Sequence, residues 1–403
     1  MTPEIKQRIE QIRRGNVPEG YQKTKDGIFP TDWHTQKMKQ WVALAERPVT
    51  LEDDKRYRLV TVRRGFGGVD LRGEYLGKDI LVKNYFRARQ GDFLISKRQI
   101  AHGACGVVPE SLDGAVVSNE YNVFVPNQGT NIEMFNLMMQ LPHYTRLFYL
   151  MSDGVHIEKL LFKTQDWMRR QLAMPPIEEQ RKIAAILATQ DEVIELKEKQ
   201  LTGKQRQKKY LMQQLLTGKK RLPGFAFEVE KTNIKAISTY SVSTISQTML
   251  ESYEGKQLYP VFNANSIAGH VDFYENECPY ISIIKDGAGI GRVRLCEAKS
   301  STIGTMGCIH ARKGISIIFL YYLLEQVDFN KYSNGSTIPH LYYKDYSCEK
   351  VRIPDIKEQA AIAEVLSTAD REIELLQQDI EQEKQKKKAL MQLLLMGIVR
   401  VKI

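Results

Sequence analysis

PPIEEQRKIAAILATQDEVIEL, residues 175–196, is answered by PDIKEQAAIAEVLSTADREIEL, residues 354–375. We call the difference in residue number between the two copies the repeat offset. The same offset relates KKYLMQQLLTG at 208–218 to KKALMQLLLMG at 387–397, and no gap intervenes. When residues 175–218 are compared with 354–397, 20 of the 44 positions are identical, which chance does not produce. The chain of 403 residues therefore contains an internal duplication.

Each copy predicts one long helix that starts after Pro175 or Pro354 and ends at Gly218 or Gly397, the usual start and stop residues. At 1.5 Å per residue, such a helix is about 60 Å long. Apolar residues recur at heptad steps, so we expect the copies to pair as an antiparallel coiled coil related by a pseudo-two-fold axis. The predicted seam contains Leu187, Ile194, Leu201, Leu215, Ile183 and Leu211, and Leu366, Ile373, Ile380, Leu394, Ile362, Leu376 and Leu390.

Basic residues gather late in both helices. They favour a solvated face that complements the helix dipole, and phosphate contacts are the alternative interpretation. The residues concerned are Lys204, Arg206, Lys208, Lys209, Lys384, Lys386, Lys387 and Lys388.

The segments between the helices have short β-type runs, aromatic residues and scattered glycines, which are typical of α/β domains. YRLVTVRRG, DFLISKRQI and YNVFVPN predict strands in the first domain, and YPVFNAN, PYISIIKDGAGIGRVRL and MGCIHAR play the same parts in the second. The fold class is therefore α+β, with two globular domains separated by the long helices. The expected divisions are 1–174 for the N-terminal segment and first domain, 175–218 for the central helix, 219–353 for the second domain and 354–403 for the distal helix.

The composition excludes several classes of protein. With 42% hydrophobic and 26% charged residues the chain reads as globular, and no run has the roughly 20 apolar residues of a membrane span. The charged N-terminus predicts no secretory signal, so a cytoplasmic location is expected. The five cysteines form no Cys-x-x-Cys pair, which argues against disulfides and zinc, and we interpret them as small buried residues. A net charge of +10 makes a polyanionic partner plausible.

The repeated E-Q-x-x-I-A-x-x-L and L-M-Q-x-L-L-x-G motifs, GSTIPHL at 335–341 and VPEGYQKTKDGIFPTDW at 17–33 resemble the specificity subunits of Type I restriction-modification systems. The resemblance covers essentially the whole chain. It implies two target recognition domains that each read one half of a bipartite, asymmetric DNA site, and helices that fix the spacer.

The resemblance also implies the partners. They are double-stranded DNA and two methyltransferase (modification) subunits that dock on the helices, and two restriction (translocase) subunits are allowed as well. Adenine methylation and restriction would be carried out by these partners. S-adenosylmethionine would bind the methyltransferase, and neither a cofactor, a metal nor a catalytic residue is expected in this chain.

A DNA reader presents Arg, Lys, Asn, Gln and other polar side chains to base edges and phosphates. In the first domain the candidates are Arg63, Arg64, Lys97, Arg98, Gln99 and His102. In the second domain they are Lys285, Arg292, Arg294, Asn334, Ser336, Thr337, His340, Tyr343 and Lys344.

Two other functions remain open. Asp286, Glu297 and Lys299 have a D-x10-E-x-K spacing that a magnesium-dependent nuclease could use, and the helices could instead belong to a coiled-coil adaptor between proteins. The glycine-rich stretches DGAGIG at 286–291 and RGFGGVD at 64–70 lack the following helix of a dinucleotide loop, so they predict turns.

Overall fold

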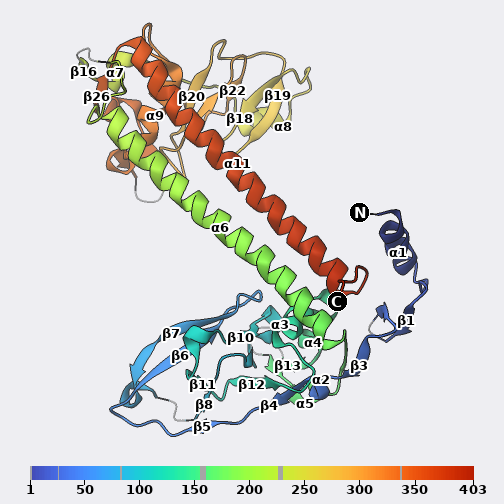
Figure 1. Cartoon of the computed structure of the whole chain (residues 1–403). Helices are drawn as coiled ribbons and strands as arrows, with labels where there is room; N and C mark the ends of the chain where they lie inside the picture. Colours follow the sequence, from blue (N-terminus) through green and yellow to red (C-terminus); the bar gives the residue numbers. More distant parts are fainter. Residues whose placement is uncertain (1, 26, 82–83, 155–159, 226–229, 336–337) are drawn as a thin grey trace. The chain divides into compact units, whose positions relative to one another are not determined.

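The computed structural model describes residues 2–25, 27–81, 84–154, 160–225, 230–335 and 338–403. The chain divides into two compact units, Met1–Leu196 with Glu381–Ile403, and Lys197–Ile380. Each unit holds one globular domain together with segments of both long helices (Figure 1). Among the described residues, no helix combines the length and apolar character that crossing a membrane requires.

The two long helices are confirmed. α6 spans Ile177–Leu216 and α11 spans Ile356–Leu395, with 40 residues each. Each helix ends two residues before the predicted glycine, which adopts the left-handed conformation, with φ of 68° at Gly218 and 65° at Gly397. A glycine in this conformation closes the last turn of a helix without the steric cost that a side chain would add.

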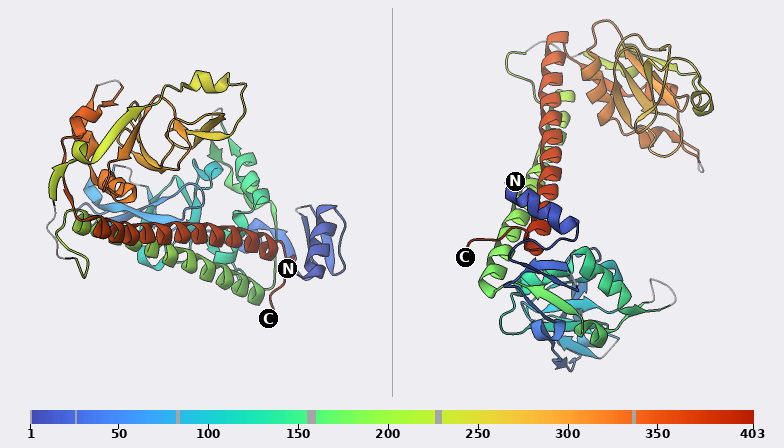
Figure 2. Two further views of the ribbon diagram at one scale, coloured as in Figure 1. Left: turned by 90° about the horizontal axis from the view of Figure 1, so that it is seen from above. Right: turned by 90° about the vertical axis from the view of Figure 1, so that its right-hand side faces the viewer.

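The helices run antiparallel. In the second unit Lys197 pairs with Asp379 and Lys204 with Glu372, both at 2.7 Å, so the partner number falls as the α6 number rises. Within each unit the α6 and α11 segments lie side by side (Figures 1 and 2). The predicted seam faces inward, and its fully buried members are Ile183, Leu187, Ile194, Leu215, Ile362, Leu366, Ile380 and Leu394.

Three of the late lysines form ion pairs that join the two long helices. Lys204 pairs with Glu372, Lys208 contacts Asp370 at 2.7 Å, and Lys387 contacts Asp191 at 2.5 Å. The last two pairs occupy equivalent places in the two units, since both residues of each pair are related by the repeat offset. For these three lysines the structure favours a role between the helices over phosphate contact.

The first domain is built on two sheets. A four-stranded sheet has the order β10-β9-β12-β4, and a five-stranded sheet has the order β5-β8-β11-β6-β7. The predicted strands YRLVTVRRG, DFLISKRQI and YNVFVPN are confirmed as β6, β9 and β12. The strands are β4 (Val42–Leu44), β5 (Pro48–Val49), β6 (Arg56–Val62), β7 (Val69–Leu76), β8 (Tyr85–Arg87), β9 (Phe93–Ser96), β10 (Cys105–Val107), β11 (Val116–Ser118) and β12 (Tyr121–Pro126).

Shorter elements connect these sheets to the helices. The strand pairs are β1 (Tyr21–Thr24) with β2 (Gly27–Pro30), β3 (His34–Lys37) with β15 (Gln171–Met174), and β13 (Ser152–Asp153) with β14 (Leu161–Phe162). The helices are α1 (Pro3–Arg13), α2 (Met38–Trp41), α3 (Ile132–Met139), α4 (Pro142–Leu150) and α5 (Thr164–Met168), with 3-10 turns at Gly77–Asp79, Ile100–His102 and Glu110–Leu112.

The second domain repeats the four-stranded sheet in the order β21-β20-β23-β17. Its strands are β16 (Glu230–Asn233), β17 (Ser238–Val242), β18 (Tyr259–Phe262), β19 (Ile267–Val271), β20 (Tyr280–Ile284), β21 (Val293–Cys296), β22 (Ser301–Thr302), β23 (Met306–Ala311), β24 (Ser333–Asn334), β25 (His340–Leu341) and β26 (Lys350–Ile353). Its helices are α7 (Ile234–Ile237), α8 (Gln247–Glu251), α9 (Ile317–Gln326) and α10 (Tyr343–Tyr346), with a 3-10 turn at Phe329–Tyr332.

The duplication holds element by element. β14, α5, β15 and α6 recur as β25, α10, β26 and α11 at the repeat offset. Earlier in each half the difference in residue number between equivalent elements is larger. It has the same value for β12 and β23 as for the starts of α3 and α9. A larger value still relates β3 to β16 and α2 to α7. Insertions between the strands therefore hide from the sequence a repeat that the strand pairing preserves.

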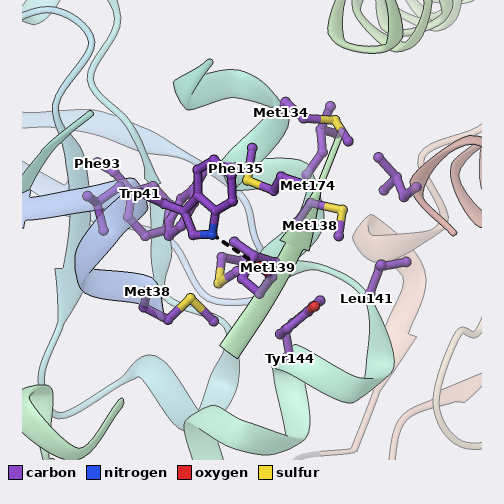
Figure 3. Packing of buried hydrophobic residues seen from close by; sticks show 14 of the residues in the cluster. Met38, Trp41, Phe93, Met134, Phe135, Met138, Met139, Leu141, Tyr144 and Met174 are labelled. Carbon is purple, nitrogen blue, oxygen red and sulfur yellow. Dashed lines mark hydrogen bonds between the residues drawn. The ribbon is translucent and has the colours of Figure 1, made fainter. Parts of the chain in front are cut away.

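A methionine-rich core joins the first domain to the helices. Figure 3 shows Met38, Met134, Met138, Met139 and Met174 around Trp41, whose ring N–H donates to the Leu172 carbonyl at 3.1 Å. These methionines are fully buried, and their flexible side chains fill the gaps between sheet and helices. The same cluster contains Ile183, Leu187, Leu394 and Leu395 from α6 and α11.

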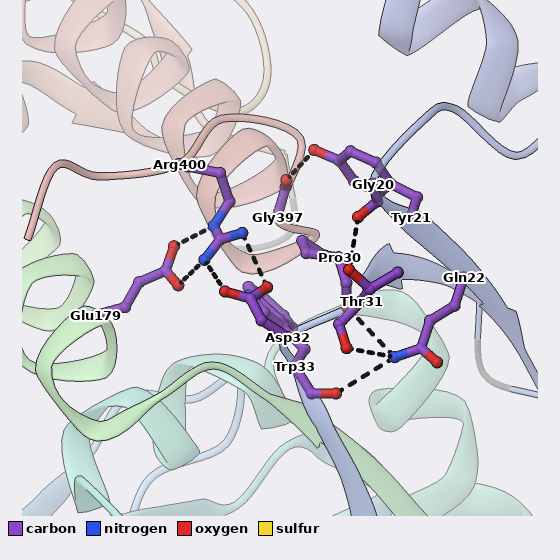
Figure 4. A network of polar contacts seen from close by, with 10 residues as sticks. All are labelled: Gly20, Tyr21, Gln22, Pro30, Thr31, Asp32, Trp33, Glu179, Gly397 and Arg400. Carbon is purple, nitrogen blue, oxygen red and sulfur yellow. Dashed lines mark hydrogen bonds and ion pairs between the residues drawn. The ribbon is translucent and has the colours of Figure 1, made fainter.

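An ion pair joins Arg400 to the start of α6. The guanidinium of Arg400 donates two hydrogen bonds of 2.6 Å to Glu179, which is fully buried, and two more to Asp32 at 2.7 and 3.0 Å (Figure 4). The second unit repeats this contact with Arg221 and the buried Glu358, whose Nε–Oε1 distance is 2.6 Å. Each arginine follows the end of one long helix and pairs with the glutamate at the start of the other.

The adjacent glutamine organises the same helix start. The Gln180 side chain accepts from the Asn131 N–H at 2.8 Å and donates to the Gly129 and Pro175 carbonyls. Gln359 accepts from the Ser316 N–H at 2.9 Å and donates to the Gly314 and Pro354 carbonyls. The repeated Glu-Gln pair is thus explained by contacts that fix each helix start to its own domain. We refer to Glu179, Gln180 and Arg400, and to Glu358, Gln359 and Arg221, as the two helix-start clasps.

The cysteines differ from expectation in two places. Cys105, Cys296 and Cys308 are buried as predicted, whereas Cys278 and Cys348 are exposed; all five are free thiols. The expectation of five buried cysteines was therefore wrong for these two residues, which lie in short polar connections rather than in a sheet.

Candidate nucleic-acid interface

In the first domain two loops meet at one end of the sheets. The N–H groups of Gly65 and Phe66, in the β6–β7 turn, donate to the carbonyls of His102 and Gly103 at 2.7 and 2.8 Å. Gly103 has φ of 74°, and a Cβ there would lie 3.0 Å from the Phe66 ring, so glycine is required. This contact brings together the loops that carry four predicted residues, of which Arg63 and Arg64 are exposed and Gln99 and His102 are half-buried.

Several of the predicted basic side chains contact a carboxylate or a backbone carbonyl. Arg63 pairs with Asp70 across the β6–β7 hairpin, and Arg98 pairs with Glu120 at 2.6 Å. The ammonium of Lys97 donates to the Asn119 carbonyl, in the turn between β11 and β12. Because Arg63 and Arg98 remain more than half exposed, their pairs are open to exchange with an external anion.

In the second domain the β20–β21 loop occupies the corresponding place, and DGAGIG forms the turn that the sequence predicted. Asp286 accepts from Lys285 and from the Nδ1 atom of His340, the latter at 2.7 Å. Burial alone would raise the pKa of Asp286, but these two hydrogen bonds outweigh it and hold the pKa below its usual range. The Gly287 N–H donates to the Pro339 carbonyl at 3.0 Å, which ties this loop to the β24–β25 hairpin.

Two predicted arginines flank this loop. Arg292 donates to the Ala264 carbonyl and to the Asn265 side chain, both at 2.7 Å. The guanidinium of Arg294 lies 4.5 Å from the centre of the Phe262 ring and is exposed. Asn334, on β24, donates to the side chain of Asp345 on α10 at 3.2 Å. Arg292, Arg294 and Asn334 are exposed, whereas Lys285 and His340 are half-buried.

Tyr343, on α10, packs against β17. Its hydroxyl contacts the Ser238 Oγ at 3.0 Å, and its ring stacks on Tyr240 with the ring centres 4.8 Å apart. Burial raises the pKa of Tyr240 to about 12. The Tyr240 ring lies beside Gly307, the residue next to Met306 on β23. Lys344, next to Tyr343, lies over the Tyr342 ring.

Ser336 and Thr337 lie outside the described residues. The structure therefore places 13 of the 15 predicted contact residues, and their contact with DNA stays a prediction.

The nuclease constellation is not assembled. Asp286 follows β20, whereas Glu297 follows β21 at the other end of the hairpin, where Cys296 pairs with Tyr280. The two carboxyl groups are separated by about seven residues of strand, or about 20 Å. No group of three metal-ligating side chains occurs among the described residues.

The sequence reasoning missed the helix-start clasps. The signal was present, because Arg221 and Arg400 are also related by the repeat offset, just beyond the glycines at which we ended the repeat.

Comparison with known proteins places this architecture. Residues 225–385 match the family model described as Type I restriction modification DNA specificity domain. The putative type I restriction enzyme MjaX specificity subunit of Methanocaldococcus jannaschii is 23% identical over 419 residues, covering 95% of this chain and 97% of that protein. The MjaVIII specificity subunit of the same organism is 26% identical over 287 residues, covering 61% of this chain and 65% of that protein.

Solved structures share the fold. The S subunit of a Type I restriction-modification system from M. genitalium aligns with a TM-score of 0.60 at 13% identity, covering 92% of this chain and 96% of that one. A chain from a structural study of complex assembly and conformational transition in the type I R-M system gives 0.58 at 15% identity, covering 92% of this chain and 99% of that one.

The fold, two repeats of one domain and one long helix, is shared with Type I restriction-modification specificity subunits. The chain is similar to subunits of this family over nearly its whole length, and residues 225–385 match the family's DNA specificity domain. Subunits of this family are the non-catalytic members of their systems, and the comparisons give no support to the nuclease or adaptor alternatives.

Proposed function

We propose that this chain reads an asymmetric, bipartite site on double-stranded DNA with one globular domain per half-site. It directs adenine methylation and restriction by partner subunits, which are two modification subunits and, where restriction occurs, two restriction subunits. In this proposal residues 1–174 and 219–353 carry recognition, while 175–218 and 354–403 form the frame. The frame also gives the partners a docking surface.

The observation that carries this proposal is the pair of four-stranded sheets of one order, β10-β9-β12-β4 and β21-β20-β23-β17. The same end of each sheet carries the predicted contact residues, but the loops there differ in length, sequence and contacts. Two domains of one fold with different loops are suited to reading two different sequences. The net charge of +10 favours the phosphate contacts that both half-sites require.

The proposal predicts that an adjacent gene encodes an adenine methyltransferase. The test is to co-express the chain with that methyltransferase and to map methylated adenines by sequencing. We expect one motif with two defined halves and an undefined gap, and footprinting should show two protected patches. A motif without a gap, or a chain that retains no methyltransferase at any salt concentration, would overturn the proposal.

A length change in the frame tests the division of labour. Insertion or deletion within residues 201–206 of α6 should alter the preferred gap or abolish activity, while the bases of each half-site stay the same. A change of base preference inside a half-site would contradict the assignment of the helices to the spacer.

A further inference from the structure

One lysine occupies the same place in both domains. β9 and β12 pair with Phe93 opposite Phe124, and β20 and β23 pair with Ile281 opposite Ile309, so the strand ends coincide at Lys97 and Lys285. The Lys97 N–H donates to the Glu120 carbonyl at 2.9 Å, and the Lys285 N–H donates to the Thr305 carbonyl at 3.2 Å.

The match extends to the neighbouring hairpin. The Lys97 carbonyl accepts from the Phe162 N–H at 3.0 Å, and the Lys285 carbonyl accepts from the Leu341 N–H at 2.8 Å. Phe162 ends β14, Leu341 ends β25, and the two strands are equivalent at the repeat offset. Each lysine therefore makes the same two backbone hydrogen bonds, so Lys97 and Lys285 have equivalent backbone positions in the two domains.

The side-chain contacts of the two lysines differ. The ammonium of Lys97 donates to a backbone carbonyl, that of Asn119, whereas the ammonium of Lys285 pairs with the carboxylate of Asp286. The next residue is Arg98 in one domain and Asp286 in the other. A local structural role would keep the partner together with the lysine, so the local contacts do not account for the shared residue.

A ligand group common to both half-sites does account for it. The half-sites of an asymmetric target differ in their bases but share the sugar-phosphate backbone. Lysine suits this group, because an ammonium acts as a point charge, whereas base reading favours the bidentate groups of Arg, Asn and Gln. Both lysines are half-buried, beside the loops that differ.

We propose that Lys97 and Lys285 each contact a DNA phosphate at the equivalent place in the two half-sites and so set the position of each domain on the duplex. They are positioning residues, and the unlike residues beside them read the bases. This inference rests on the proposed function.

Matched controls are available in the same repeat. Lys39 on α2 and Lys235 on α7 are also equivalent, and both are exposed. Val42, three residues after Lys39, pairs with Pro126, whereas Ser96 pairs with Tyr121, so Lys39 lies at the other end of the sheet from Lys97. Removing either lysine changes the net charge by the same amount.

The experiment measures DNA binding by the chain in complex with its methyltransferase, using a duplex that carries the target and one that does not, between about 50 and 200 mM salt. Lys97→Ala and Lys285→Ala should each make the negative slope of log affinity against log salt shallower by about 0.9, so affinity falls roughly 3.5-fold less over this range. Both duplexes should be affected alike, and the methylated sequence should not change. Lys97→Arg and Lys285→Arg should restore the slope, while Lys39→Ala and Lys235→Ala should leave it unchanged.

An unchanged slope in the alanine variants, with two half-sites still protected, would overturn this inference and leave the proposed function standing. A changed methylated sequence would also overturn it, because the lysines would then read bases. Failure of the parent complex to protect two half-sites would instead remove the proposed function itself.

Discussion

The two halves of the duplication share the same contacts in the helix-start clasps but not in the loops beside Lys97 and Lys285. In the clasps each contact recurs between equivalent atoms, down to the two carbonyls that Gln180 and Gln359 reach. In the loops, only the backbone of one lysine recurs. The difference indicates that folding fixes the clasps, because a buried carboxylate cannot lose its partner cheaply, whereas the exposed loops are free to follow the DNA.

The largest expected effect comes from breaking a clasp. Arg400→Ala leaves the fully buried Glu179 without its partner, and we expect the first unit to lose about 2 to 3 kcal/mol of unfolding free energy. Arg221→Ala should destabilise the second unit in the same way through Glu358. Urea unfolding, followed by hydrogen exchange at the start of α6 and of α11, checks both variants.

Arg181→Ala is the control for that experiment. Arg181 also pairs with a glutamate at the start of α6, but both side chains are more than half exposed, so the loss should stay below about 0.5 kcal/mol. If Arg181→Ala and Arg400→Ala cost the same, burial does not distinguish the clasp from an ordinary surface pair.

The clasp glutamines give the next largest effect. Gln180→Ala removes three hydrogen bonds from a buried side chain and leaves the Pro175 and Gly129 carbonyls without that donor. We expect a loss of about 1 to 3 kcal/mol, and the same loss within error for Gln359→Ala. Thermal unfolding of the two variants tests this equality. A large effect for one glutamine and none for the other would show that the clasps are alike in geometry but not in energy.

Prediction from sequence succeeded where the signal was a local periodicity. The helices, the seam from Ile183 to Leu394 and the strands β6, β9 and β12 follow from periodicity, because burial on one face imposes it. The contacts between Glu179 and Arg400 could not be derived, since they join residues far apart in the chain. The equivalence of Lys97 and Lys285 was hidden for a different reason. Their offset exceeds that of the long helices, and insertions on either side change it, so only strand register reveals the match.

Acid weakens the ion pair that Arg400 of the first clasp forms with Asp32. The Arg400 guanidinium holds the pKa of Asp32 below its usual value, chiefly by hydrogen bonding. Stability from this pair is therefore present above about pH 4, where the unfolded carboxyl is ionised, and is lost as pH falls through the lowered pKa of the folded state. In Arg400→Ala the fall in stability below pH 4 should be smaller. Urea titrations between about pH 2 and 5 measure it, and equal pH dependence in the parent and the variant would rule the pair out as a source of acid sensitivity.

The smallest effect concerns a strand pair beside the long helices at which the two units differ. Lys231 on β16 lies directly opposite Arg352 on β26, both exposed, whereas the first unit has Thr35 opposite Ala173. Like charges in facing positions are unfavourable, so Lys231→Glu should stabilise the second unit by about 0.2 to 1 kcal/mol. The gain should shrink between about 0.05 and 0.5 M salt.

Thr35→Glu is the matched control, because it places the same carboxylate opposite an alanine and should change stability by less than about 0.5 kcal/mol. Denaturant unfolding of both variants at the two salt concentrations decides the point. A gain that persists at high salt would assign the effect to strand propensity rather than to charge. A gain that salt removes would mean that the second unit keeps an unfavourable pair which folding alone does not explain, so the strand pair beside the long helices also differs between the two halves.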